Sequence, residues 1–223
     1  MLMRETPVVI AGPVGQIEAL YLDNEQPIGI ALICHPNPVQ GGTMLNKVVS
    51  TLQRTARDAG LITLRFNYRG VGASEGTHDM GTGEVDDAQV VAAWLREKHP
   101  DLPLTLFGFS FGGFVAASLG GRLEAQGVQL KHLFMVAPAV MRLGEQDQLP
   151  QHGELTVIQA VRQAVGHALT VAGEQQLATQ AQVTQFLQGL ARLRLDAVGQ
   201  QQPGEELPVQ RKPGNRAVMG WDR

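Results

Sequence analysis

The sequence has almost no cysteine and no long apolar run. Its single cysteine, Cys34, cannot form a disulfide within the chain, which suits a reducing compartment. No apolar run reaches the roughly 18 residues that a membrane-spanning helix needs, and the segment Met1–Thr6 contains no apolar signal core. We therefore expect a cytoplasmic protein with no export signal and no membrane partner.

The sequence also lacks an excess of basic residues. Its 18 Lys and Arg are outnumbered by 21 Asp and Glu, which gives a formal net charge of −3. Proteins that bind nucleic acids neutralise phosphates with a basic surface, so this composition argues against a nucleic-acid or other polyanion partner. A hydrophobic content of 43% in 223 residues is instead typical of one globular domain with a substantial core.

The strongest local signal lies between Leu104 and Phe114. An apolar run of strand character leads into Gly-x-Ser-x-Gly around Ser110, and an alanine-rich segment compatible with a helix follows. This order predicts a nucleophile elbow, a sharp turn that holds its serine at strained backbone angles and exposes the hydroxyl. Gly108 and Gly112 are expected there because a Cβ at either position would collide with the neighbouring turn. The alternative is a glycine-rich loop with an ordinary serine.

Strands and helices alternate along the first 159 residues. The predicted strands cover residues 8–11, 17–22, 28–34, 61–66, 104–107, 130–138 and 154–159, and helices are predicted at about 45–59, at about 84–99 and after Ser110. The first two strands read as an antiparallel pair. The alternation predicts an α/β fold with a doubly wound, mostly parallel sheet. The site of such a sheet lies beyond the carboxyl ends of its strands, where the loops at His35, Asn67 and Ser110 should converge.

The loop that begins at His35 is the expected source of an oxyanion donor. A tetrahedral oxyanion needs hydrogen-bond donors already in place, and in an elbow one of them is the N–H of the residue after the serine, here Phe111. Proline has no N–H, so Asn37 is the predicted second donor within His35–Pro38, with Val39 or Gln40 next in line. The alternative is that the two prolines merely stiffen a surface turn.

His35 is itself a candidate for two roles. We expect it to support the oxyanion loop through its ring nitrogens, and a role as catalytic base is the alternative. Tyr68 and Arg69 follow another predicted strand, where they are candidates for substrate contact or for structural packing.

Three motifs resemble those of a group of small, compact hydrolases in the α/β-hydrolase superfamily. They are His35–Val49 (HPNPVQGGTMLNKVV), Thr63–Gly76 (TLRFNYRGVGASEG) and Gly108–Gly113 (GFSFGG), in the same order and at similar distances. The resemblance covers about residues 8–159. It implies the α/β-hydrolase fold and a cytoplasmic enzyme that cleaves an ester or similar acyl bond of a small molecule by a Ser-His-Asp mechanism. Ser110 would be the nucleophile, and no metal or organic cofactor would be needed.

The resemblance stops near Gln159, before the expected acid and base. The group places its aspartate just after the strand that corresponds to Leu155–Gln159 and its histidine further on, in a Gly-His segment, but residues 160–167 contain no carboxylate. In the chain order nucleophile, acid, base, the pairing that remains is Asp147 as the acid with His167, or alternatively His152, as the base. Asp147, however, precedes the last clear strand instead of following it.

Composition changes at the same place. Residues 160–223 contain 11 glutamines and a single lysine. We therefore divide the chain into an α/β-hydrolase core with the elbow (1–159), a divergent and atypical helical segment (160–198) and a disordered tail (199–223). Within the second segment, hydrophobic residues between about Glu174 and Leu193 predict an amphipathic helix.

Three explanations for this C-terminal part remain open. The leading hypothesis is a frameshift near residue 159, in the gene or in its recorded sequence. The second is a divergent tail on a catalytically inactive, α/β-hydrolase-like binding protein. The third is an active enzyme whose acid and base lie elsewhere. The sequence thus favours a serine hydrolase that forms an acyl-enzyme on Ser110, with an inactive binding protein as the alternative.

Overall fold

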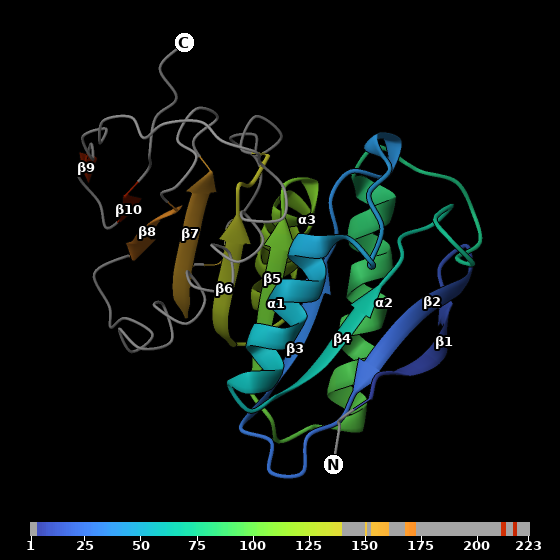
Figure 1. The fold of residues 1–223 in the computed structure, drawn as a ribbon, viewed down its shortest axis with the longest axis horizontal. Coiled ribbons are helices and arrows are strands. Elements are labelled where there is room, and N and C mark those ends of the chain that lie inside the picture. The colour runs from blue at the N-terminus through green and yellow to red at the C-terminus, as the bar shows by residue number, and fades with distance from the viewer. Residues whose placement is uncertain are drawn as a thin grey trace, which may run out of the picture.

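Eight strands form one sheet in the computed structural model, which describes residues 4–139, 150, 153–160, 168–172, 211–212 and 216–217 (Figure 1). The strands lie in the order β1-β2-β4-β3-β5-β6-β7-β8. Their bounds are β1 Thr6–Gly12, β2 Gly15–Leu22, β3 Gly29–Cys34, β4 Leu61–Phe66, β5 Leu104–Phe109, β6 Leu130–Val136, β7 Glu154–Ala160 and β8 Ala168–Ala172. The helical elements of this described part are the 3-10 helix η1 Pro38–Gln40, α1 Lys47–Asp58, α2 Thr82–Lys98 and α3 Phe111–Ala125.

The middle of the sheet is parallel and its margins are antiparallel. β4, β3, β5, β6 and β7 run parallel to one another. β1 pairs with β2, β2 with β4 and β7 with β8 in antiparallel fashion. The doubly wound, mostly parallel sheet and the antiparallel opening pair predicted from the sequence are therefore confirmed.

Helices cover both faces of the parallel strands, with α1 on one face and α2 and α3 on the other (Figure 1). The side chains of β3 alternate between the two cores. Ala31 and Ile33 pack in the core that contains Leu52 of α1, whereas Ile30 and Leu32 belong to the core beneath α2 and α3. A strand covered on both faces has no polar side, which explains the continuous apolar run around residues 28–34.

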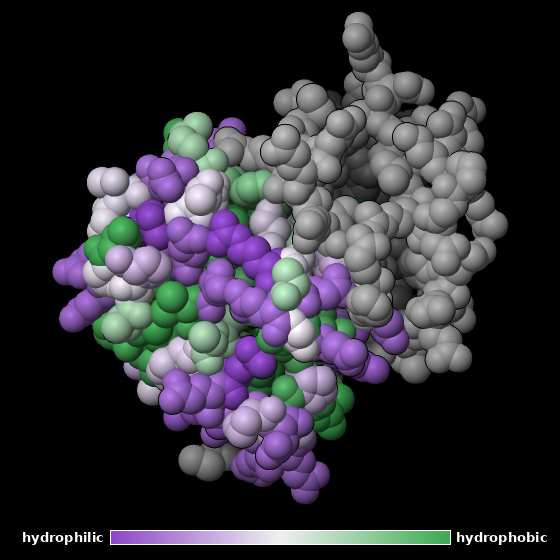
Figure 2. Space-filling model, turned by 180° about the vertical axis from the view of Figure 1, so that it is seen from behind, coloured by the Kyte–Doolittle hydropathy of each residue, from purple (hydrophilic) through white to green (hydrophobic). Residues whose placement is uncertain are grey.

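The surface over α2 and α3 is mixed in character. Figure 2 shows this face, on which hydrophobic residues appear in separate places between hydrophilic ones over the described part of the chain. In α2, Val85, Ala88 and Leu95 are buried, so the helix turns its apolar side toward the sheet and its polar side outward. None of the helices in the described ranges has both the length and the apolarity that crossing a bilayer requires.

The start of α1 is set by Asn46. Its side-chain oxygen accepts a hydrogen bond from the Val48 N–H at 2.9 Å, which satisfies a donor that the helix cannot bond internally. The helix was predicted to begin at about residue 45, but Leu45 precedes this cap and is 63% exposed, so the predicted start is two residues too early. Gly60, with a positive φ of 88°, follows the end of the helix.

Beyond residue 160 the described structure consists of short strands. β8 falls within the segment that was predicted to be helical, and Arg211–Lys212 (β9) pairs with Arg216–Ala217 (β10) in a separate two-stranded sheet. The amphipathic helix predicted between about Glu174 and Leu193, and the rest of the predicted disordered tail, lie outside the described residues.

Candidate active site

Ser110 lies on a sharp turn between β5 and α3. Its backbone angles are φ 54° and ψ −116°, a conformation that costs a residue other than glycine about 1–3 kcal/mol. The Ser110 N–H donates to the Val136 carbonyl at 2.9 Å, and the Ser110 carbonyl accepts from the Ala139 N–H at 3.0 Å. These hydrogen bonds hold the strained backbone against the end of β6. The strand, the strained serine and the helix predicted from the Gly-x-Ser-x-Gly pattern are all present.

Gly108 and Gly112 allow chain segments to approach closely at this turn. A Cβ on Gly108 would lie 2.1 Å from the Gly112 carbonyl oxygen, and a Cβ on Gly112 would lie 2.2 Å from that of Cys34. Both distances are far inside van der Waals contact, so the collisions expected from the sequence are confirmed. The second contact sets the first turn of α3 against the end of β3, where the His35 loop (residues 35–43) begins.

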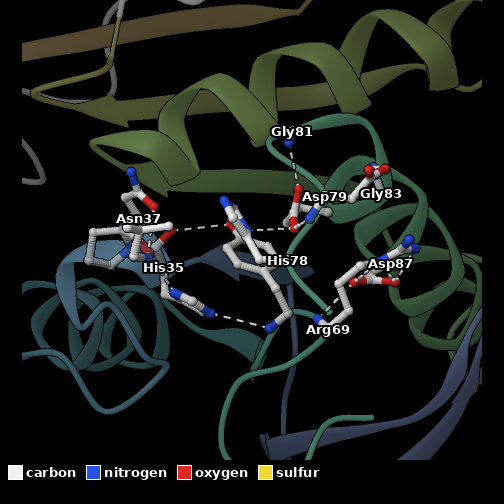
Figure 3. A network of polar contacts seen from close by, with 12 residues as sticks. His35, Asn37, Arg69, His78, Asp79, Gly81, Gly83 and Asp87 are labelled. Atoms are coloured by element: carbon white, nitrogen blue, oxygen red, sulfur yellow. Dashed lines mark hydrogen bonds and ion pairs between the residues drawn. The ribbon is translucent and has the colours of Figure 1, made fainter. Parts of the chain in front are cut away.

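The ring of His35 ties its loop to the segment after β4. Nε2 accepts a hydrogen bond from the Tyr68 N–H at 3.2 Å, and Nδ1 donates to the Pro36 carbonyl at 2.7 Å (Figure 3). The Tyr68 hydroxyl donates in turn to the His35 carbonyl at 3.2 Å. Burial lowers the pKa of His35 to about 4, so the ring is neutral. Because both ring nitrogens are engaged, His35 makes the contacts of a supporting residue.

Asn37 organises the short turn that contains η1. Its side-chain oxygen accepts from the Val39 N–H at 3.0 Å, and its carbonyl accepts from the N–H groups of Gln40 at 3.1 Å and Gly42 at 3.0 Å. Val39 and Gln40 were the alternatives to Asn37 as oxyanion donors. Since both of their N–H groups already donate within the turn, the Asn37 N–H is the remaining candidate of the three.

The loop after β4 is fixed by buried polar contacts. The Asn67 side-chain oxygen accepts from the Met44 N–H at 2.9 Å, which joins this loop to the His35 side of the sheet. Arg69 forms a buried ion pair with Asp87 of α2, with 2.7 Å between Nη2 and Oδ1, and its N–H donates to the same carboxylate at 2.9 Å. Tyr68 is fully buried. The structure thus gives Tyr68 and Arg69 packing contacts, the second of the two roles considered for them.

A histidine–carboxylate pair at this end of the sheet was missed by the sequence reasoning. Nδ1 of His78 lies 2.7 Å from Oε1 of Glu84, and the His78 ring packs edge-on against the Phe111 ring with 5.9 Å between centroids (Figure 3). Glu84 is fully buried and accepts hydrogen bonds from the N–H groups of Asp79 at 2.8 Å and Gly81 at 2.7 Å. No local sequence pattern marks His78, because its contacts are with Glu84 and Phe111, which lie in α2 and α3.

The predicted acid Asp147 and the predicted base His167 lie outside the described residues, as does the alternative base His152. Within the ranges that the structure describes, no group of three or more His, Cys, Asp or Glu side chains is placed to hold a metal ion.

The comparison with protein families adds an independent finding. Residues 79–218, more than half of the chain, match the model of the thioesterase domain. The chain belongs to the thioesterase domain family. The matched span of this thioesterase domain includes Ser110 and continues past Gln159, where the motif resemblance stops.

Solved structures share the architecture of this thioesterase-family chain. An α/β serine hydrolase homologue from Coxiella burnetii is 32% identical with a TM-score of 0.64, and the match covers 84% of this chain and 83% of that one. An α/β serine hydrolase without a lid from Xanthomonas campestris is 35% identical with a TM-score of 0.62, over 71% and 72% of the two chains. The thioesterase-family chain therefore has the α/β-hydrolase fold.

A curated relative is known from sequence. An uncharacterized protein of Rickettsia prowazekii is 38% identical over 138 residues, which is 61% of this thioesterase-family chain. The chain spans 56% of the length of that relative.

Proposed function

We propose that this chain is a serine hydrolase that cleaves a thioester or another ester-like acyl bond of a small molecule through an acyl-enzyme on Ser110. The strained turn at Ser110 carries the proposal, because a serine held at φ 54° between a strand and a helix has the backbone geometry of a nucleophile elbow, in which the serine is presented to the substrate. Membership of the thioesterase domain family and the likeness to α/β serine hydrolases support hydrolysis of an acyl bond.

The proposed reaction has two halves. Oγ of Ser110 attacks the acyl carbonyl while a base takes its proton, and the alcohol or thiol then leaves with a proton. Water next attacks the acyl-enzyme, releases the acid and restores the serine. In each half the negative oxygen accepts hydrogen bonds from the N–H groups of Phe111 and Asn37, which the turn and the His35 loop hold in place.

Hydrogen bonds of His35 and close packing at Gly112 support this proposal. His35 fixes the backbone that presents Asn37, through its bonds to Pro36 and Tyr68. Close approach at Gly112 keeps the first turn of α3 against the same loop. The reaction as proposed uses no metal and no organic cofactor, and we propose that it takes place in the cytoplasm without a nucleic-acid or membrane partner.

A fluorophosphonate probe tests the function, because such probes react with activated serines. Wild-type protein should be labelled, and Ser110→Ala should abolish the labelling. Ser118→Ala, in the same helix, is the matched control and should leave it unchanged. If folded wild-type protein is not labelled, the hydrolase proposal is wrong and the rival, an inactive α/β-hydrolase-like protein that binds a ligand, takes its place.

A further inference from the structure

We propose that Asn67 is a positioning residue that fixes the Asn37 N–H in place for the oxyanion. Its side-chain amide is oriented by Glu18 and holds the end of the His35 loop through Met44. The inference rests on the proposed function and deepens it, because it names the group that positions the second oxyanion donor.

The two ends of the His35 loop press against each other. The Gly42 N–H donates to the Asn37 carbonyl at 3.0 Å, and a Cβ on Gly42 would lie 2.1 Å from the Pro36 carbonyl oxygen. The Pro36 carbonyl and the Asn37 N–H belong to one planar peptide unit, so this contact bears on the proposed donor itself. The position of the donor therefore depends on what holds the chain after Gly42.

Met44 anchors the chain two residues after Gly42. Its N–H donates to the Asn67 side-chain oxygen at 2.9 Å, and its carbonyl accepts from Nη1 of Arg65 at 2.8 Å. The Met44 side chain is buried as well. Both hydrogen-bond partners come from the end of β4, which ties the end of the His35 loop to the central sheet.

The neighbours of Asn67 require an acceptor on one side and a donor on the other. Oδ1 faces the Met44 N–H, and Nδ2 donates to Oε2 of Glu18 at 2.8 Å. A carboxylate at this position would face the like charge of Glu18, and a hydrocarbon would leave the Met44 N–H without this acceptor. The Glu18 carboxylate thereby decides which way the amide points.

The loop after β4 closes over this pair of side chains. A Cβ on Gly72, which has a φ of 58°, would lie 2.5 Å from Nδ2 of Asn67 and 2.5 Å from Oε2 of Glu18. The Ser74 hydroxyl donates to the Asn67 carbonyl at 2.7 Å and accepts from the Glu18 N–H at 3.0 Å. Asn67 is 4% exposed, so water hardly competes for its hydrogen bonds.

These contacts give the Asn67 amide a defined effect on the proposed reaction. An oxyanion donor acts at about 2.7–3.1 Å from the negative oxygen, and a misplacement of about 1 Å can cost about 100-fold in rate. Loss of the amide should therefore slow bond formation at Ser110. It should not change how an acyl compound binds before it reacts.

Fluorophosphonate labelling of the full chain at a series of probe concentrations tests this role, because it separates probe binding from the limiting rate of bond formation. Asn67→Leu, which is nearly isosteric, should lower the limiting rate about 10- to 100-fold and leave the half-saturating concentration within about threefold. Gln53→Leu is the matched control. It removes another buried amide, which bonds the Thr63 hydroxyl between α1 and β4, and should keep the wild-type limiting rate.

Variants of Glu18 test the orientation of the amide. Glu18→Leu should slow labelling as Asn67→Leu does, and Glu18→Gln should recover most of that rate, because its amide oxygen can still accept from Asn67. Glu18 is only half-buried, so Glu18→Leu is measured in place of Asn67→Leu if the latter does not fold.

Backbone hydrogen exchange tests the loop without any reaction. The N–H groups of Gln40 and Gly42 both donate to the Asn37 carbonyl. They should exchange faster in Asn67→Leu than in wild type and should be unchanged in Gln53→Leu.

The possible results separate this inference from the function on which it rests. Unlabelled wild-type protein removes both. Labelled wild type together with a folded Asn67→Leu that reacts at the wild-type limiting rate removes the role of Asn67 alone. An equal loss in Gln53→Leu, or unchanged exchange at Gln40 and Gly42, also overturns it, because the amide would then act by packing. A loss confined to Asn67→Leu and Glu18→Leu, with recovery in Glu18→Gln, supports it.

Discussion

His35 illustrates how burial fixes the charge of a side chain near the serine. Its Nε2 accepts a hydrogen bond from the Tyr68 N–H, and a proton on Nε2 would place two donors against each other. Burial disfavours the charged ring as well, and these two effects agree with the lowering of the His35 pKa to about 4. The neutral ring is therefore a structural requirement of the loop that carries Asn37.

Folding stability should fall with acid because of this histidine. The unfolded pKa is about 6.5 and the folded pKa is about 4, so between these values the unfolded chain binds more protons and stability is lost as the pH falls. The loss due to His35 should be about 1.4 kcal/mol between about pH 7.5 and about pH 5.5. Urea unfolding at both pH values measures it. His35→Gln should lack this part of the pH dependence, and an unchanged dependence in the variant would contradict the assignment.

The geometry around Ser110 could be predicted from the sequence, whereas the contacts of His78 and Glu84 could not. Ser110 and its two glycines form one contiguous pattern, so local sterics alone predicted their geometry. His78 and Glu84 matter only through their approach to Phe111 on another element, which no local pattern encodes. Glu84 is buried, and its N–H donors come from the preceding loop.

A buried ion pair between Arg69 and Asp87 joins the loop after β4 to helix α2. The Arg69 guanidinium binds the Asp87 carboxylate, whose side chain is fully buried, and the Arg69 N–H uses the same group. The neighbouring Asp86 instead pairs with Arg122 near the surface, where the two side chains are 44% and 38% exposed. Two adjacent acids of one helix thus offer a buried and an exposed ion pair for comparison.

Removal of the buried charge should be much more costly than removal of the exposed one. Asp87→Asn leaves the Arg69 charge buried without its partner, and such losses typically cost about 3–5 kcal/mol. Asp86→Asn breaks a pair that water screens, so it should cost less than about 1 kcal/mol. Denaturant unfolding of both variants gives the two values. Equal costs would mean that the Arg69 pair does not anchor the loop.

Prediction of secondary structure from sequence worked best where both faces of a strand are buried, because mostly apolar residues fit there. The strand around residues 28–34 carries apolar residues on both faces, as expected in the middle of a parallel sheet. Leu45 failed because hydrophobic spacing extended the helix across its own cap, Asn46. β8 was not predicted, since its formation depends on the neighbouring edge of β7 and not on a pattern of its own.

The loops around Ser110 and the expected positions of the acid and base belong to different parts of the chain. The loops that meet at Ser110 follow β3, β4 and β5, all before residue 111. In the resembling hydrolases the acid and base follow the strand that corresponds to β7. Here only residues 161–167 separate β7 from β8, and β8 returns antiparallel. A parallel crossover needs about a dozen residues or more, so no further parallel strand can follow β7 before β8.

The frameshift hypothesis makes a testable prediction about the missing acid and base. If the reading frame changes near Gln159, one of the other two frames of the downstream DNA should encode an aspartate in a strand-end turn and, further on, a Gly-His segment. A chain restored in that frame should be labelled by fluorophosphonate, and replacement of the restored histidine by alanine should slow its labelling at least about 100-fold, because that histidine takes the proton. If neither frame encodes these residues, the frameshift hypothesis is wrong, and the divergent binding protein and the enzyme with its acid and base elsewhere are the two explanations left.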